Sequence, residues 1–279
     1  MNTHSSNPAA SAFHEWPLVV FTTLAIMGAG LLTTPLIAWL VSGTPAPAAG
    51  AVRWGALLLG AGLLVSLAHL GRPLRAPLAP RGIGRSRLSA EVVVAGLALV
   101  LGIVTAMLPY VSPVLDLATA AAAIAFLATL GLVYSLPGQQ TWRGAVVWMP
   151  LSSGLGFSAV ALAGIWGDSV VAIGAVAAVA LAADTALLIV RRLSLAWPRT
   201  ELAPRYPTLF ARRQWLLAAR FALVDILPGC SLLAGLPKGA AGLLALGILV
   251  DRLGFYGFAS QHTTEAEVER VEGIIGSRA

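Results

Sequence analysis

Apolar residues in this chain are gathered into long runs that short polar segments separate. Several runs reach about 20 residues, the length of helix that crosses roughly 30 Å of membrane hydrocarbon. The pattern therefore predicts an all-α polytopic membrane protein, folded as a bundle of eight transmembrane helices. The predicted spans are 17–41, 54–70, 92–108, 114–136, 145–166, 169–190, 214–236 and 239–259.

The segments between the runs contain the residues that are typical of turns. Proline and glycine recur in SGTPAPAAG, LPYVSP, LPGQQT and GLPKG. The turn WGD is so short that the fifth and sixth spans are expected to be antiparallel neighbours. We predict one integral-membrane domain over 1–279, with a disordered tail at 1–13, the bundle at 14–262 and a C-terminal tail at 263–279.

The composition excludes several other classes of protein. The chain is 58% apolar and 11% charged, whereas soluble domains carry roughly 25% charged residues. Its single cysteine, Cys230, lies in an apolar run, which excludes disulfide frameworks and paired-cysteine metal sites within the chain. The segment before the first run has no lysine or arginine, so we expect that run to be a permanent helix and not a cleaved signal peptide.

Basic residues are distributed unevenly between the two ends of the predicted bundle. An even number of spans places both termini on one side, together with the connections 71–91, 137–144 and 191–213. The other side holds only Arg53 and Lys238. The positive-inside rule then predicts that the long loops and both termini are cytoplasmic. We expect this basic side to contact lipid headgroups or an acidic partner, not nucleic acid. Its basic residues are Arg72, Arg75, Arg81, Arg85, Arg87, Arg143, Arg191, Arg192, Arg199, Arg205, Arg212, Arg213, Arg270 and Arg278.

Histidine and glutamate gather at the ends of the spans on this same side. His69 is in the last turn of the second span and Glu91 in the first turn of the third, while His14, Glu15 and His262 flank the first and last spans. The imidazole pKa of about 6.5 suits proton exchange near neutral pH. A proton-handling site is therefore one interpretation, and solvated or structural roles at the interface are the other. Because no histidine lies deep in a span, ligation of haem by two histidines is disfavoured.

Five ionisable residues fall inside the predicted spans. An ionisable group at membrane depth costs about 2.5–3.5 kcal/mol, so such groups usually pair or line a polar path. We expect the two arginines of this set to pair with its aspartates. Two interpretations stay open: salt bridges that fix helix packing, and a proton path from the opposite face. The five residues are Asp184, Arg220, Asp225, Asp251 and Arg252.

Four segments together resemble the DmsC family, the membrane-anchor subunits of DMSO reductase-type molybdoenzymes. They are HEWPL at 14–18, HLGRPLR at 69–75, SAE at 89–91 and DRLGFYG at 251–257. Their order and spacing match over nearly the whole chain, and the glutamate that follows the arginine of HLGRPLR by sixteen residues makes the match fairly specific.

The resemblance implies an anchor without haem that binds an iron–sulfur subunit, which in turn is joined to a molybdopterin catalytic subunit. Ubiquinone or menaquinone would exchange electrons and protons near the docking face. Carried across residue by residue, His69, Arg75 and Glu91 fall on positions implicated in quinone binding and proton handling. No metal site is expected in this chain, and the partners would supply all the metal.

Further candidate residues follow from their position on the same side of the bundle. His14, Arg252 and Tyr256 are candidates for the quinone pocket, since Arg252 and Tyr256 are one helical turn apart and point toward the histidine-bearing side. The candidates for partner docking are Arg72, Arg81, Arg85 and Arg87. The candidates for a proton path are Asp184, Asp225 and Asp251.

The charge bias also bears on which partner the anchor serves. Anchors of exported reductases place the docking face outside the cell, whereas the bias here places it inside. This arrangement resembles the SoeC-type anchors of complexes that oxidise sulfite to sulfate in the cytoplasm and reduce quinone. The alternatives are a quinol-oxidising anchor of a DMSO reductase-type terminal reductase, a purely structural anchor, and a secondary transporter. The transporter is disfavoured because its site would lie near the membrane midplane, whereas the polar residues here gather at one surface.

Overall fold

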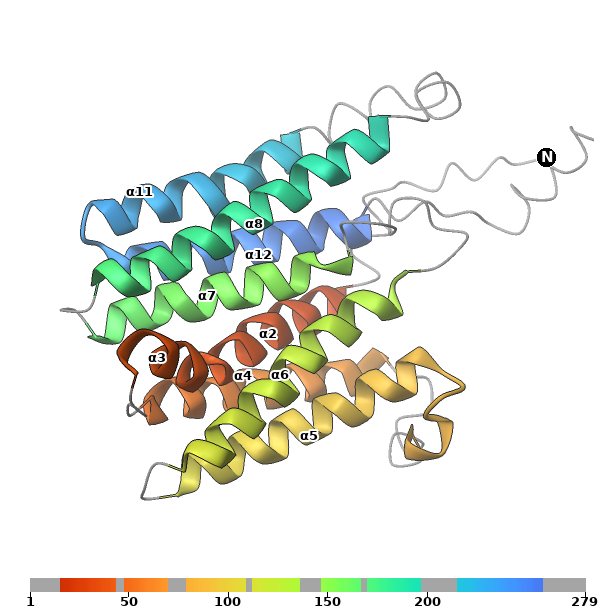
Figure 1. Cartoon of the computed structure of the whole chain (residues 1–279). Coiled ribbons are helices and arrows are strands. Elements are labelled where there is room, and N and C mark those ends of the chain that lie inside the picture. The colour runs from red at the N-terminus through yellow and green to blue at the C-terminus, as the bar shows by residue number, and fades with distance from the viewer. Residues whose placement is uncertain are drawn as a thin grey trace, which may run out of the picture.

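The computed structural model describes residues 16–43, 48–69, 79–108, 112–135, 147–166, 170–196 and 215–257. Within these ranges the chain forms helices and no strand. Figure 1 shows them as a bundle of helices that lie side by side. The helices are α2 (Trp16–Leu32), α3 (Thr34–Ser42), α4 (Ala49–His69), α5 (Arg87–Met107), α6 (Pro113–Val133), α7 (Met149–Trp166), α8 (Val170–Ala196), the π-helical turn η5 (Ala222–Ile226), α11 (Leu227–Leu233) and α12 (Pro237–Gly257).

The predicted all-α membrane architecture is confirmed. Among the described residues, seven helical segments are long and apolar enough to cross a membrane. In this count α2 and α3 form one segment, Trp16–Ser42, and Trp215–Leu233, which contains η5 and α11, forms another. The remaining predicted span, α7, is a shorter apolar helix. The predicted start of the second span at 54 was wrong, because α4 begins at Ala49. Arg53 belongs to this helix, where its Nε donates to the carbonyl oxygen of Ala106 at 3.3 Å.

Helix α2 lies at the centre of the bundle and packs against α4, α6, α7 and α12. Two of its glycines allow close approach of neighbouring backbones. A Cβ on Gly28 would lie 2.8 Å from the carbonyl oxygen of Gly55 in α4, and one on Gly30 would collide with the carbonyl oxygen of Gly154 in α7. Lipid tails are as apolar as the helix surfaces, so no hydrophobic driving force holds membrane helices together. Close packing at small residues such as these glycines stabilises the contact instead.

The first membrane span is interrupted between α2 and α3. Pro35 lies in the first turn of α3 and has no N–H to donate to the preceding turn. The hydroxyl of Thr33 donates to the carbonyl oxygen of Gly30, and that of Thr34 donates to the carbonyl oxygen of Leu31, both at 2.7 Å. Side-chain donors thus satisfy carbonyls at the break, as a membrane interior requires. Figure 1 shows α3 turning away from the line of α2.

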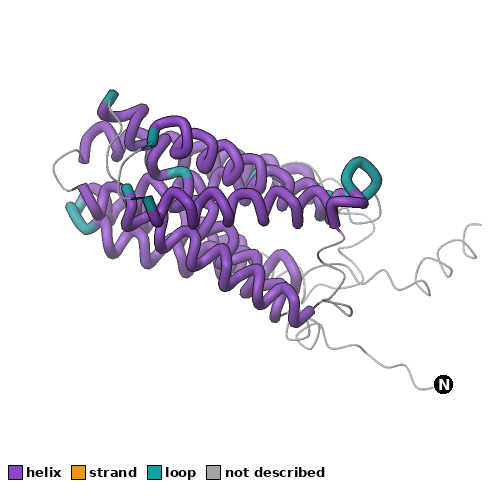
Figure 2. Tube along the Cα trace, turned by 90° about the horizontal axis from the view of Figure 1, so that it is seen from below, coloured by secondary structure: helices purple, strands orange, loops and turns teal. Residues whose placement is uncertain are grey.

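The start of α2 and the end of α12 lie at the same end of the bundle. A small apolar cluster there joins Val19 of α2, Met149 of α7, Leu188 of α8, and Phe255 and Tyr256 of α12. The view in Figure 2 shows the helices running along a common direction, so that their ends collect at two faces. The end that contains this cluster is called the Glu91 end below, because Glu91 opens α5 there.

Candidate functional site

Glu91 is a buried carboxylate at the end of a membrane helix. Helix α5 begins at Arg87, after Ser86, whose hydroxyl accepts a hydrogen bond from the backbone N–H of Ser89. The Glu91 residue is only 3% exposed, and its Oε1 atom has no hydrogen-bond partner in the part of the chain that the structure describes. A buried polar atom without a partner costs about 1–3 kcal/mol. Such an atom is a functional candidate because packing alone does not explain it.

Three aromatic rings pack together at the same end of the bundle as this carboxylate. Tyr134 follows the last turn of α6, and its ring makes edge-on contacts with Phe255 and Tyr256 of α12, with centroids 5.3 and 5.7 Å apart. The hydroxyls of both tyrosines lie within electrostatic range of the Glu91 carboxyl group. Helices α5, α6 and α12 therefore bring one carboxyl group and two phenols into electrostatic range of one another, with Glu91 and Tyr256 buried and Tyr134 half-buried.

Arg252 connects this aromatic group to a second group of buried charges. Its guanidinium carbon lies 4.9 Å from the centre of the Phe255 ring, and its charge acts on the hydroxyls of Tyr134 and Tyr256. The same guanidinium donates through Nε and Nη2 to Oδ2 of Asp251, with the Nε bond at 3.1 Å. Tyr256 contacts the ring of Tyr134, and Arg252, one helical turn before it, lies within electrostatic range of the same residue.

Arg220 is the centre of the second group. Its Nε donates to Oδ1 of Asp251 at 3.2 Å, its Nη1 lies 3.5 Å from Oδ2 of Asp225, and its Nη2 is bonded to Oδ2 of Asp184. All four side chains are at least nine-tenths buried. The predicted pairing of the intramembrane arginines with the aspartates is therefore confirmed. Asp184 also accepts hydrogen bonds from the hydroxyls of two α7 residues, Ser152 and Ser153.

The π-helical turn η5 explains how Arg220 meets Asp225. Asp225 is five positions after Arg220, and a regular α-helix would place the two about 140° apart around its axis. The π-helical turn at Ala222–Ile226 has more residues per turn than an α-helix, so it reduces the angle between Arg220 and Asp225. Pro228 follows this turn; it is buried and has no N–H to donate to the preceding turn. The Asp225 carboxylate is also bonded by the side chain of Thr185 in α8, while its buried Oδ1 atom has no partner among the described residues.

The candidate docking arginines differ from one another. Arg81 and Arg85 are exposed in the segment before α5. Arg87 is also exposed, but its Nη1 donates to the carbonyl oxygens of Leu132 and Ser135 at 3.1 and 2.9 Å and so binds the end of α6. Arg87 therefore joins the start of α5 to the end of α6, independently of any role in partner docking.

Several predicted site residues fall outside what the structure describes. His69 ends α4, but its side chain lies outside the description. His14, Arg72 and Arg75 belong to segments that are not described. Of the predicted set, the structure places Tyr256 within electrostatic range of both Glu91 and Arg252. The three aspartates surround Arg220, and Asp251 is also bonded to Arg252.

Sequence reasoning missed the roles of Tyr134 and of the two serines. Tyr134 had the position of an ordinary interfacial aromatic residue, and nothing in the sequence indicated that its ring meets α12. Ser152 and Ser153 are adjacent polar residues in an apolar helix, a signal that would have marked them as partners of an intramembrane charge.

Comparison with known proteins agrees with the resemblance seen in the sequence. Residues 9–258 match the family described as DMSO reductase anchor subunit (DmsC). The YnfH chain of anaerobic dimethyl sulfoxide reductase from Escherichia coli (strain K12) is 28% identical over 281 residues, which cover 88% of this protein and 95% of that relative. The C chain of anaerobic dimethyl sulfoxide reductase from the same organism is 28% identical over 278 residues, with 88% and 96% covered. The protein therefore belongs to the DMSO reductase anchor subunit (DmsC) family.

Proposed function

We propose that this protein is the membrane anchor and the quinone-reactive subunit of a molybdopterin and iron–sulfur oxidoreductase. One observation supports it above others: the buried Oε1 atom of Glu91 has no partner in the described residues, and the carboxyl group is within electrostatic range of the hydroxyls of Tyr134 and Tyr256. A site that exchanges protons with a quinone needs a carboxyl group, hydrogen-bond donors and an apolar surrounding. These residues meet that need.

The residues at the Glu91 end fit a quinone by their chemistry. A protonated or ionised Glu91 offers Oε1 as donor or acceptor to a ring oxygen. Tyr134 and Tyr256 carry hydroxyls that hydrogen-bond to such an oxygen, and Phe255 supplies an apolar face. The bound quinone would supply the transfer of two electrons and two protons. Glu91 would hold and release the proton, and Arg252 would stabilise negative charge nearby. His14, His69 and Arg75 are further proposed members of this site.

We extend the proposal to the supply of protons. The aspartate group at Arg220 is contiguous with the tyrosines through Arg252, because that guanidinium binds Asp251 and acts on both phenols. Asp184, Asp225 and Asp251 would then form a buried polar route that ends near Glu91.

The basic residues next to Glu91 are the proposed docking surface for the iron–sulfur subunit. Arg81 and Arg85 are exposed and Arg87 is partly used by α6, while Arg72 completes the proposed set. The docked subunit would bring a cluster close to the quinone site and connect it to the molybdopterin subunit. The excess of arginine in these loops supports a cytoplasmic position for the docking face and both termini.

Two catalytic reactions are candidates for the partner. The charge bias favours a cytoplasmic catalytic subunit, and with it oxidation of sulfite to sulfate coupled to reduction of quinone. The two relatives are named as chains of dimethyl sulfoxide reductases, which favours quinol oxidation for a terminal reductase. We place sulfite oxidation first, because the distribution of charge is a property of this protein itself.

The quinone role is tested with Glu91→Gln in the purified complex. Glutamine keeps the size of the side chain but does not transfer a proton, so we expect quinone turnover to fall by roughly 10²-fold or more while the subunits remain assembled. Lys238→Gln, at the other end of α12, is the matched control and should leave turnover unchanged. Normal turnover in an assembled Glu91→Gln complex would refute the site.

The partner reaction is tested on the same preparation. The complex is purified through a tag on this protein in mild detergent and is given sulfite with a soluble quinone, or quinol with DMSO. Reduction of quinone by sulfite supports the first assignment, and oxidation of quinol by DMSO replaces it with the second. A complex without molybdenum or iron would contradict the anchor function as a whole.

A further inference from the structure

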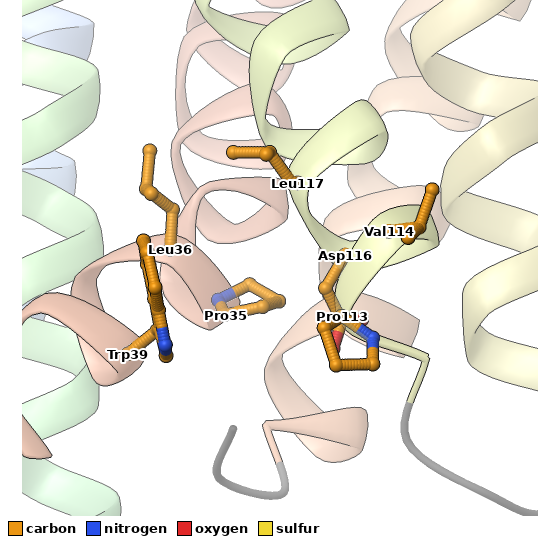
Figure 3. A pocket seen from close by; sticks show the side chains of 7 residues that line it. All are labelled: Pro35, Leu36, Trp39, Pro113, Val114, Asp116 and Leu117. Atoms are coloured by element: carbon orange, nitrogen blue, oxygen red, sulfur yellow. The ribbon is translucent and has the colours of Figure 1, made fainter. Parts of the chain in front are cut away.

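A cavity at the end of the bundle opposite to Glu91 belongs to none of the sites above. It has a volume of about 180 Å³ and lies between the first turns of α3 and of α6. Figure 3 shows side chains of the two helices on either side of it. The lining residues are Pro35, Leu36, Trp39, Pro113, Val114, Asp116 and Leu117.

The break in the first span creates this space. Pro35 redirects the chain at Thr33, so that α3 does not continue the line of α2 and leaves room beside α6. Pro113 occupies the first turn of α6 in the same way that Pro35 occupies the first turn of α3. Because proline fixes the backbone at both helix starts, the two walls of the cavity are stiff.

The cavity opens toward lipid. Val114 is 80% exposed, and Leu117 and Trp39 are about half exposed, in a protein whose exposed apolar surface faces the membrane. Trp39 and the first turn of α6 lie at the ends of their helices, the depth at which tryptophan belts and lipid headgroups occur. A lipid molecule therefore reaches this cavity without crossing the protein.

The charged group in the lining is a carboxylate. Asp116 lies in the first turn of α6, and none of the ion pairs among the described residues includes it. An ionised carboxylate only accepts hydrogen bonds, so its natural partner is a donor with positive charge. A quinone is a poor occupant, because its carbonyl oxygens also accept and would face this carboxylate.

We propose that this cavity binds a phospholipid whose headgroup carries a primary ammonium, as in phosphatidylethanolamine. The ammonium donates to the carboxylate of Asp116, and the upper part of the lipid lies against Leu36, Trp39 and Leu117. A quaternary ammonium of the same charge has no N–H to donate and does not make this bond. The lipid holds the redirected α3 against α6 at the membrane surface.

The test compares lipids that differ only in the headgroup. The full-length protein is exchanged into phosphatidylethanolamine or phosphatidylcholine with identical acyl chains, stripped with mild detergent, and measured by native mass spectrometry. We expect about one phosphatidylethanolamine to be retained per protein and at least roughly tenfold less phosphatidylcholine, as the loss of a charge-assisted hydrogen bond predicts. Equal retention of the two lipids would overturn the proposal.

Variants locate the lipid in this cavity. Asp116→Asn removes the charge and should reduce retention of phosphatidylethanolamine to the level of phosphatidylcholine. Leu36→Trp fills the space and should have the same effect, whereas Leu40→Trp, on the exposed face of α3 outside the lining, should retain the lipid. Undiminished retention in Leu36→Trp contradicts the site even if the Asp116 variant does not fold. The readout needs no quinone turnover, so its outcome is independent of the proposed function.

Discussion

Arg220 and Asp225 form a buried ion pair within one membrane helix, with Nη1 of the arginine 3.5 Å from Oδ2 of the aspartate. The π-helical turn between them makes the pair possible, and the same guanidinium also binds Asp184 and Asp251. One side chain thereby joins α8, α12 and the helix that contains η5. The stability of this half of the bundle should depend on it.

Replacement of Arg220 by methionine should destabilise the protein by about 3–5 kcal/mol, because three buried carboxylates would lose their common partner. Arg220→Lys should be intermediate in stability, since an ammonium does not match the geometry of three carboxylates. Unfolding in detergent, followed by circular dichroism, measures the effect. Lys238→Met, which removes an exposed charge from the start of α12, is the control and should change stability little. If Arg220→Met is as stable as the control, the ionic group does not hold the helices together.

Tyr134→Phe should lower quinone turnover by roughly tenfold and leave the fold intact, as the loss of one hydrogen bond to the reacting group predicts. The substitution removes the hydroxyl beside Glu91 but keeps the ring that contacts Phe255 and Tyr256. Phe255→Leu is the converse change, because it disturbs ring packing and keeps both hydroxyls; it should affect stability more than turnover. Steady-state kinetics with a soluble quinone, together with thermal unfolding, separate the two effects. Equal turnover in Tyr134→Phe and the unmodified complex would remove this tyrosine from the site.

Gly30→Ala adds a single methyl group, yet it should destabilise the protein strongly. The added methyl group would collide with the carbonyl oxygen of Gly154 and push α2 away from α7, at a cost of about 1–3 kcal/mol. Gly96→Ala in α5 is the matched control, because a Cβ there meets nothing within 4 Å and alanine favours the helix. The midpoint temperature of thermal unfolding should fall in Gly30→Ala and rise slightly in Gly96→Ala. A neutral Gly30→Ala would show that the α2–α7 contact has room to move.

Reversal of charge at Arg81 and Arg85 should weaken attachment of the iron–sulfur subunit. Both side chains are exposed next to the start of α5, so Arg81→Glu with Arg85→Glu changes the surface and not the core. Co-purification of the partner at increasing salt measures attachment, and the contribution of exposed charges should decline as salt rises. Lys238→Glu at the opposite end should have no effect. Unchanged co-purification would place the docking surface elsewhere.

A reporter fused to the C-terminus tests the orientation. If the arginine-rich loops are cytoplasmic, a green fluorescent protein fusion should fluoresce and an alkaline phosphatase fusion should be inactive. The reverse pattern would place the Glu91 end outside the cytoplasm. That outcome would favour the terminal-reductase assignment over sulfite oxidation.

The sequence alone determined the class of this protein. Apolar runs of sufficient length have no stable alternative to helices in a membrane, so the all-α bundle and the approximate spans followed directly. The cost of charge in hydrocarbon was also enough to predict that Arg220 and Arg252 pair with aspartates. The motif around HLGRPLR indicated the family, which the comparisons confirmed. Each of these inferences rests on local composition or spacing.

Only the tertiary structure decided which side chains meet. Glu91, Tyr134 and Tyr256 come from three helices, and their proximity depends on how each helix is rotated about its axis. The pair of Arg220 with Asp225 depends on a π-helical turn that regular helical spacing does not predict. Nearly continuous apolar sequence carries little information about rotation, because lipid and protein interior are equally apolar. Close contacts between helices, such as that of Gly30 with Gly154, fix the rotation instead.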